Sequence, residues 1–197
     1  MKVALIVPEY TANIIRNVAE ENLDNMELDV MVYKNYLKAV EIVEKVQKRY
    51  DAIMFAGIVV YSFVKSHVKE ECIWGYFPLH ESSLSFAILK ALYIEENIKN
   101  ISIDTYSMES IKEVYDFIGI DFDEVNVMLY DVKADSYNIT EDALKFHKNN
   151  LKNKDNICII TALSDVNKQL NIEKISCHMA IPTKSIIIDS FQNLYLR

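Results

Sequence analysis

Short apolar runs alternate with amphipathic segments from the beginning of the chain. Residues 3–7 are continuously apolar and stop at Pro8, which predicts a buried strand. Apolar side chains then recur every three to four residues over residues 14–23, which predicts a helix. The same alternation continues with strands over residues 28–33 and 51–57 and a helix over residues 37–50. Alternating strands and helices favour a parallel sheet covered by helices on both faces.

The second half of the chain repeats this pattern. The predicted strands are residues 72–79 (interrupted by Pro78), 101–105, 125–130, 157–163 and 178–181, and the predicted helices are residues 82–96, 109–118, 141–153, 165–170 and a last one from about residue 184. The fold class is therefore α/β. We expect two small doubly wound parallel-sheet lobes, flavodoxin-like or periplasmic-binding-protein-like, around a cleft.

The pattern also predicts where the lobes divide. We expect residues 1–79 to form the first lobe, residues 80–181 the second, and residues 182–197 a C-terminal helix. The apolar stripe of that helix reaches Arg197 with no glycine or proline to stop it. Two interpretations remain open: the protein simply ends there, or the helix continues toward an output domain outside this sequence.

Composition and charge exclude several classes of function. The chain has 21 basic and 29 acidic side chains, a net charge of -8, whereas nucleic-acid binders usually have a basic surplus. Three glycines in 197 residues cannot build a Walker loop or a dinucleotide-binding turn. No segment resembles an export signal or a membrane span, and the three cysteines form no C-x-x-C pair, which disfavours a disulfide framework or a structural zinc site. We expect a cytoplasmic protein that contacts neither membrane nor nucleic acid.

The candidate binding residues lie at or after the carboxyl ends of the predicted strands, because ligands of open parallel sheets bind there, beside helix N-termini. These residues are Glu9, Tyr10, Gly57, His80, Ser82, Ser83, Thr105, Ser107, Thr161, Ser164, Thr183 and Lys184. Hydroxyl groups and backbone N–H groups suit a small polar or anionic ligand. The alternative is that the serines and threonines are ordinary helix N-caps, each worth about 1 kcal/mol, with no ligand at all.

Catalytic and metal-binding patterns are weak. His80, Glu81 and Ser82 are adjacent and point in different directions, so they cannot form a triad, and no G-x-S-x-G motif is present. His67 and Glu71 have the spacing of two metal ligands on a helix but lack an evident third. We therefore expect no catalytic residue, no cofactor and no metal, with Cys158, His147 and His178 packed in the interior or on the surface.

A set of ordered segments occurs along the chain: residues 50–57, the strand into Pro78, the helix from Ser82, and residues 141–147, 159–166 and 181–186. Together these segments resemble the sensory domain of bacterial propionate-catabolism-type transcriptional regulators. The resemblance implies a two-lobed domain that binds a small-molecule effector in its cleft. Such a domain controls a covalently linked output domain that binds DNA or works with RNA polymerase.

Carried over to this chain, the resemblance implies ligand contacts at Gly57, Ser82, Ser83, Thr105, Ser107, Thr161, Ser164 and Thr183. One position departs from the pattern. The family often has an arginine before the strand-ending glycine, where this chain has Ala56. That change argues against a tricarboxylate ligand, because Lys184 is the one cation among the candidate residues.

Three hypotheses about function follow, and they belong to different classes. The first is a non-enzymatic, small-molecule-sensing domain of a bacterial transcriptional regulator. The second is a free-standing isomerase or lyase that uses Glu9, His80 or Glu81 as acid or base. The third is an interaction module whose acidic surface docks a basic partner or a second copy of the chain.

Overall fold

The computed structural model describes residues 1–197 except 25, 95, 133–136, 155 and 197. The chain folds into two compact units. Of the described residues, unit 1 contains those of Met1–Leu79 and Pro182–Arg197 together with Tyr137, and unit 2 contains the remainder. The C-terminal segment, expected to be a helix apart from both lobes, is thus part of the unit that the N-terminal segment forms.

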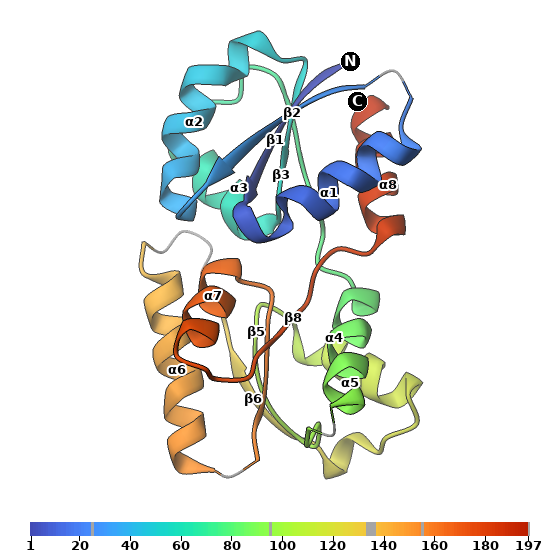
Figure 1. The fold of residues 1–197 in the computed structure, drawn as a ribbon, viewed down its shortest axis with the longest axis vertical. Helices are drawn as coiled ribbons and strands as arrows, with labels where there is room; N and C mark the ends of the chain where they lie inside the picture. Colours follow the sequence, from blue (N-terminus) through green and yellow to red (C-terminus); the bar gives the residue numbers. More distant parts are fainter. Residues whose placement is uncertain (25, 95, 133–136, 155, 197) are drawn as a thin grey trace. The chain divides into compact units, whose positions relative to one another are not determined.

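Unit 1 is built on a four-stranded parallel sheet (Figure 1). Its strands are β1 (Lys2–Pro8), β2 (Glu27–Tyr33), β3 (Ala52–Phe55) and β4 (Ile73–Tyr76), in the order β2-β1-β3-β4. Its helices are α1 (Glu9–Asn22), α2 (Ala39–Val46), α3 (Ile58–Lys65) and α8 (Lys184–Tyr195). Helices α1 and α8 pack against each other on one face of the sheet, and α2 packs against α3 on the other.

Unit 2 repeats this plan. Its parallel strands are β5 (Asn100–Asp104), β6 (Asn126–Tyr130), β7 (Cys158–Thr161) and β8 (His178–Met179), in the order β6-β5-β7-β8. Its helices are α4 (Glu81–Tyr93), α5 (Met108–Phe117), α6 (Ile139–Asn153) and α7 (Ser164–Ile172), and the contacts pair α4 with α5 and α6 with α7. The prediction of two α/β lobes with parallel sheets is confirmed.

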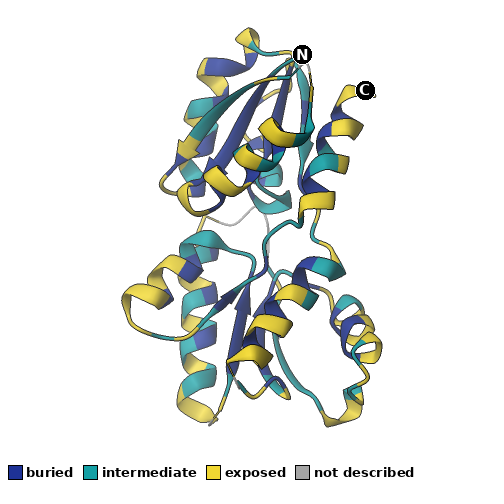
Figure 2. Ribbon diagram, turned by 45° about the vertical axis from the view of Figure 1, so that its right-hand side comes forward, coloured by how far each residue is buried: buried dark blue, intermediate teal, exposed yellow. Residues whose placement is uncertain are grey.

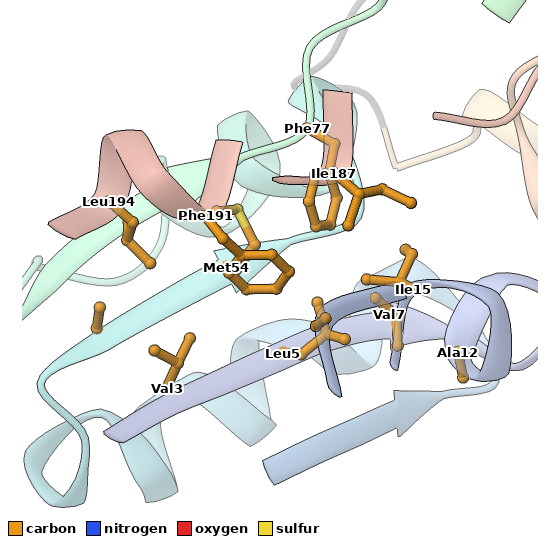
Figure 3. Close-up of a cluster of buried hydrophobic side chains, with 12 residues drawn as sticks. Val3, Leu5, Val7, Ala12, Ile15, Met54, Phe77, Ile187, Phe191 and Leu194 are labelled. Carbon is orange, nitrogen blue, oxygen red and sulfur yellow. The ribbon is translucent and has the colours of Figure 1, made fainter. Parts of the chain in front are cut away.

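The core of unit 1 follows from the alternation of side chains along β1. Val3, Leu5 and Val7 face α1 and α8, where Ile187 and Phe191 pack over them (Figure 3). The residues between them are also fully buried, because the opposite face is covered by α2 and α3. The central strands of each sheet are dark blue (buried) in Figure 2, while the outer faces of the helices are yellow (exposed). A strand buried on both faces is what a continuous apolar run predicts.

Two of the helices differ from the expectations. Helix α3 was not predicted, because its sequence IVVYSFVK is apolar on most of its circumference and shows no amphipathic stripe. The helix expected over residues 37–50 consists of α2 between two 3-10 turns, Tyr36–Lys38 and Gln47–Arg49. No helix in the described part of the chain is long and apolar enough to cross a membrane.

Candidate functional site

The most organised polar site of unit 2 lies where β5 and β7 end. In the strand order β6-β5-β7-β8, the chain leaves these two neighbours in opposite directions, which is the point where doubly wound sheets bind ligands. Asp104 is the last residue of β5 and is fully buried. The hydroxyl of Thr161, the last residue of β7, donates to Asp104 Oδ2 (2.5 Å), and the Ala162 N–H donates to Oδ1 (3.1 Å).

A histidine from α6 also belongs to this network. His147 Nε2 lies 3.1 Å from Asp104 Oδ2, and its Nδ1 lies 2.8 Å from the Ser102 hydroxyl. Asn150 Nδ2 donates to the same hydroxyl (2.8 Å). His147 was expected to be a packing histidine, and it is fully buried, but both of its ring nitrogens have polar partners. A connected network of buried polar groups holds its members in one arrangement.

Thr105 follows Asp104 with a left-handed backbone, at φ 67°. This region is unfavourable for a β-branched residue and persists only where the surroundings impose it. The Thr105 hydroxyl donates to the Asp104 carbonyl oxygen (2.6 Å). Strained residues of this kind concentrate at functional sites, so the backbone at Thr105 marks the end of β5 as the candidate site.

The helices that begin at this edge differ in how their N-termini are satisfied. Ser107 caps α5, because its hydroxyl accepts from the Ser110 N–H (3.0 Å). Helix α7 begins at Ser164 without a side-chain cap from any described residue, and the Ser164 hydroxyl lies 3.9 Å from Met179 Sδ instead. An uncapped helix N-terminus offers N–H donors and a positive dipole end to an anion.

The beginning of α4 is more enclosed. His80 caps this helix through Nδ1, which accepts from the Ser82 N–H (3.1 Å). Ser83 is buried beside Tyr106, and burial raises the pKa of the Tyr106 hydroxyl. Glu81 is stabilised as a carboxylate, since hydrogen bonds from its own N–H and from the Ser110 side chain lower its pKa.

Unit 1 presents a second group at the corresponding edge. Glu9 and Tyr10 are exposed in the first turn of α1, directly after β1, and Gly57 precedes α3, two residues after the end of β3. Neither helix has a side-chain cap from a described residue. Thr11 was not among the candidates, yet its buried hydroxyl has no hydrogen-bond partner in the described part of unit 1.

The remaining candidates of unit 1 lie at the start of α8. Thr183 caps this helix by accepting from the Ile186 N–H (3.5 Å), and Lys184 is exposed. Ser107 and Thr183 thus have the capping role that the alternative interpretation predicts for the serines and threonines, and His80 caps α4, which was not predicted. The structure brings Thr105, Thr161 and Ser164 together with the buried Asp104 in unit 2.

His67 and Glu71, which have the sequence spacing of two metal ligands, contact other groups of the protein. His67 Nδ1 lies 2.7 Å from the Phe63 carbonyl oxygen, its Nε2 contacts the Tyr137 hydroxyl, and Glu71 pairs with Lys48 (3.6 Å). Cys158 is buried as predicted, and burial raises the pKa of its thiol.

Comparison with known proteins supports the fold. No protein-family model and no curated protein sequence matches the chain. Among solved structures, an NtrC family transcriptional regulator from Clostridium acetobutylicum superposes with a TM-score of 0.67 at 14% identity, covering 100% of this chain and 95% of that one. The ABC domain in complex with L-Trp from Streptococcus pneumonia gives a TM-score of 0.49 at 12% identity, covering 99% and 83%. The chain therefore has the fold of a solved transcriptional-regulator structure.

Proposed function

We propose that this chain is the small-molecule-sensing domain of a transcriptional regulator, and that it binds a small polar or anionic metabolite at the carboxyl edge of the unit 2 sheet. The observation that supports the proposal most is the strained backbone of Thr105 beside the buried Asp104 network, at the point where the strand order reverses.

The network gives the site its rigidity. Asp104 accepts from Thr161 and Ala162, so it fixes the turn that leads from β7 into α7. Asp104 and His147 are both fully buried, which makes them positioning residues that act through this turn. A donor group that is already held in place binds a ligand without further loss of conformational entropy.

The chemistry of the edge suits a carboxylate or phosphate group. The start of α7 has no side-chain cap from a described residue and provides the positive end of a helix dipole, which the negative charge of Asp165 in its first turn partly offsets. The Ser164 hydroxyl adds a hydrogen-bond donor, whose contact within the protein is the long one to Met179 Sδ (3.9 Å). The other polar groups nearby are already used within the protein, since Thr105 and Thr161 both donate to Asp104. We therefore expect the α7 N-terminus and Ser164 to make the direct contacts.

The link to regulation rests on the shared fold and on the absence of a catalytic arrangement among the described candidate residues. A sensor changes its output only as far as the ligand prefers one conformation over another, and it releases the ligand unchanged. Sensing and catalysis are therefore separated by the fate of the bound molecule.

A binding screen tests the proposal. Small carboxylates and phosphate esters are screened by thermal shift, and hits are measured by calorimetry. Ser164→Ala should weaken the binding of a hit about tenfold, the value of one lost hydrogen bond to a charged group. The control variant Ser66→Ala removes a hydroxyl at the C-terminal end of α3, in unit 1, and should leave the affinity for the ligand unchanged.

Three results would contradict the proposal. The first is that none of the carboxylates or phosphate esters in the panel binds to the protein. Equal weakening by Ser66→Ala would place the ligand elsewhere. Conversion of a bound compound to product, followed by mass spectrometry, would favour the isomerase or lyase hypothesis instead.

A further inference from the structure

A second polar cluster in unit 2 is formed by the segment after α4 and the strands β7 and β8, which α4 contacts. Glu96 follows α4, Cys158 is the first residue of β7, and His178 is the first residue of β8. One ligand atom from each lies within 4.8 Å of the other two. Cys158 and His178 are 1% and 3% exposed, whereas the Glu96 side chain is 22% exposed and reaches water.

Hydrogen bonds to Glu96 join the members of this cluster. His178 Nε2 lies 2.9 Å from Glu96 Oε2, and the Ser176 hydroxyl donates to Glu96 Oε1. The Cys158 side chain also hydrogen-bonds to Glu96, so Glu96, Cys158 and His178 Nε2 converge on one point. An ion at that point would replace the hydrogen bonds between these three groups. His178 Nδ1, which is buried without a partner among the described residues, points in another direction and takes no part in the site.

The donor set is that of a transition-metal site. Thiolate, imidazole and carboxylate together are ligands of zinc, whereas magnesium and calcium prefer oxygen alone. We propose that Glu96, Cys158 and His178 bind a zinc ion or a divalent ion of similar softness. Three protein ligands leave a fourth position for water or another donor.

Such an ion has a structural consequence. Strand β8 contains two residues, and it is joined to β7 by a short parallel ladder. A metal held by the first residues of both strands and by Glu96 ties β8 to the sheet and to the end of α4. Because binding requires the folded arrangement, the ion stabilises unit 2.

The neighbouring cysteine provides a matched control. Cys177 directly precedes His178, but it packs with Ile159 and Ala143 against α6 and α7. Adjacent residues of a strand point to opposite faces of a sheet, so Cys177 belongs to the other face.

The test uses the full chain, freed of metal and titrated with Co²⁺ as a spectroscopic probe. We expect one equivalent to bind, with a thiolate-to-cobalt charge-transfer band that zinc removes by competition. Cys158→Ser should abolish the band and Glu96→Gln should weaken affinity at least about tenfold, a loss typical of altered metal shells. Cys177→Ser should leave both unchanged, and Mg²⁺ should not compete.

A measurement on the unaltered protein guards against variants that fail to fold. X-ray absorption at the zinc edge should show one sulfur and at least two nitrogen or oxygen ligands. A first shell without sulfur, the absence of stoichiometric binding, or equal loss of the band in Cys177→Ser would overturn the proposal. Metabolite binding by the Cys158→Ser variant is measured as well. It separates the two proposals, because the sensor function can hold even if the metal site does not.

Discussion

Thr105 shows how a single residue is held against its own preference. Its left-handed backbone costs on the order of 1–3 kcal/mol for a residue with a side chain, and glycine adopts the same backbone without steric cost. We expect Thr105→Gly to be more stable than Thr105→Ala by about 1 kcal/mol, although both lose the hydroxyl. Urea unfolding of the two variants measures this difference.

The comparison of two substitutions isolates the backbone from the side chain. Thr105→Ala and Thr105→Gly both remove the hydrogen bond to the Asp104 carbonyl oxygen, so that loss cancels. An alanine variant as stable as the glycine variant would mean that the backbone at this position is not left-handed in solution.

Glu81 gives a prediction about pH. Hydrogen bonds from its own N–H and from Ser110 lower its pKa below the ordinary value of 4.5. Its carboxylate therefore contributes stability that is fully present above about pH 4.5 and is lost as the pH falls through the lower, folded-state pKa. We expect the difference in unfolding free energy between the wild type and Glu81→Gln to shrink with acidification below that pH. Denaturant unfolding at a series of pH values measures it.

The Ser110→Ala variant tests the cause of that shift. Without the Ser110 hydroxyl, the pKa of Glu81 should move back toward 4.5, which a carbon-13 NMR titration of the carboxyl group follows. An unchanged midpoint would assign the lowering to other groups.

At the scale of elements, the docking of α8 on β4 decides how unit 1 closes. A Cβ atom at Gly75 would lie 2.8 Å from Leu194 Cδ1 and 3.4 Å from Met54 Cε. We expect Gly75→Ala to cost about 1–2 kcal/mol through overpacking and Leu194→Ala about 3 kcal/mol through the cavity that it leaves. The double variant should be more stable than the sum predicts, because truncating Leu194 makes room for the new methyl group.

Unfolding free energies of the wild type, both single variants and the double variant measure this coupling. Strict additivity would show that α8 does not lie over Gly75 in solution. The same contact explains why strand β4 tolerates a glycine, a residue that usually weakens a strand.

The type of an element was predicted correctly where its apolar residues follow the pattern of a strand or of a helix alone. The run before Pro8 predicted β1, and the stripe after it predicted α1. Helix α3 was not predicted, because an apolar helix that is buried on several sides has no polar face to reveal its period. Strand β8 was predicted longer than the two residues observed, since the propensity of a segment does not determine how much of it pairs.

At the scale of the whole molecule, unit 1 is completed by a segment far away in the sequence. Ile187, Phe191 and Leu194 of α8 cover the same face of the sheet as α1. Removal of residues 182–197 should therefore raise hydrogen exchange in β1, β3 and β4, because their apolar face becomes exposed. Strands β5 and β7 should retain their protection.

Hydrogen exchange followed by mass spectrometry of the shortened and full chains checks this prediction. Equal loss of protection in both sheets would mean that the two units do not unfold as separate cooperative bodies.

The polar network of unit 2 shows what local pattern cannot supply. Thr105, Thr161 and Ser164 were named because they follow strands, and that rule needs only the positions of strand ends. Asp104 and His147 were missed, since 43 residues separate them and neither stands in a recognisable motif. The same reason hid the cluster of Glu96, Cys158 and His178, which comes from three distant segments.

The amino-acid sequence by itself determined the fold class, because the periods of its apolar residues and the positions of Pro8 and Pro78 are local properties of the chain. Only the tertiary structure decided which strands are neighbours, that α8 returns to unit 1, and which distant side chains meet. The physical reason is that hydrophobic burial is non-directional, so that the pattern specifies what must be buried. Close packing and the satisfaction of buried polar groups then select the partners.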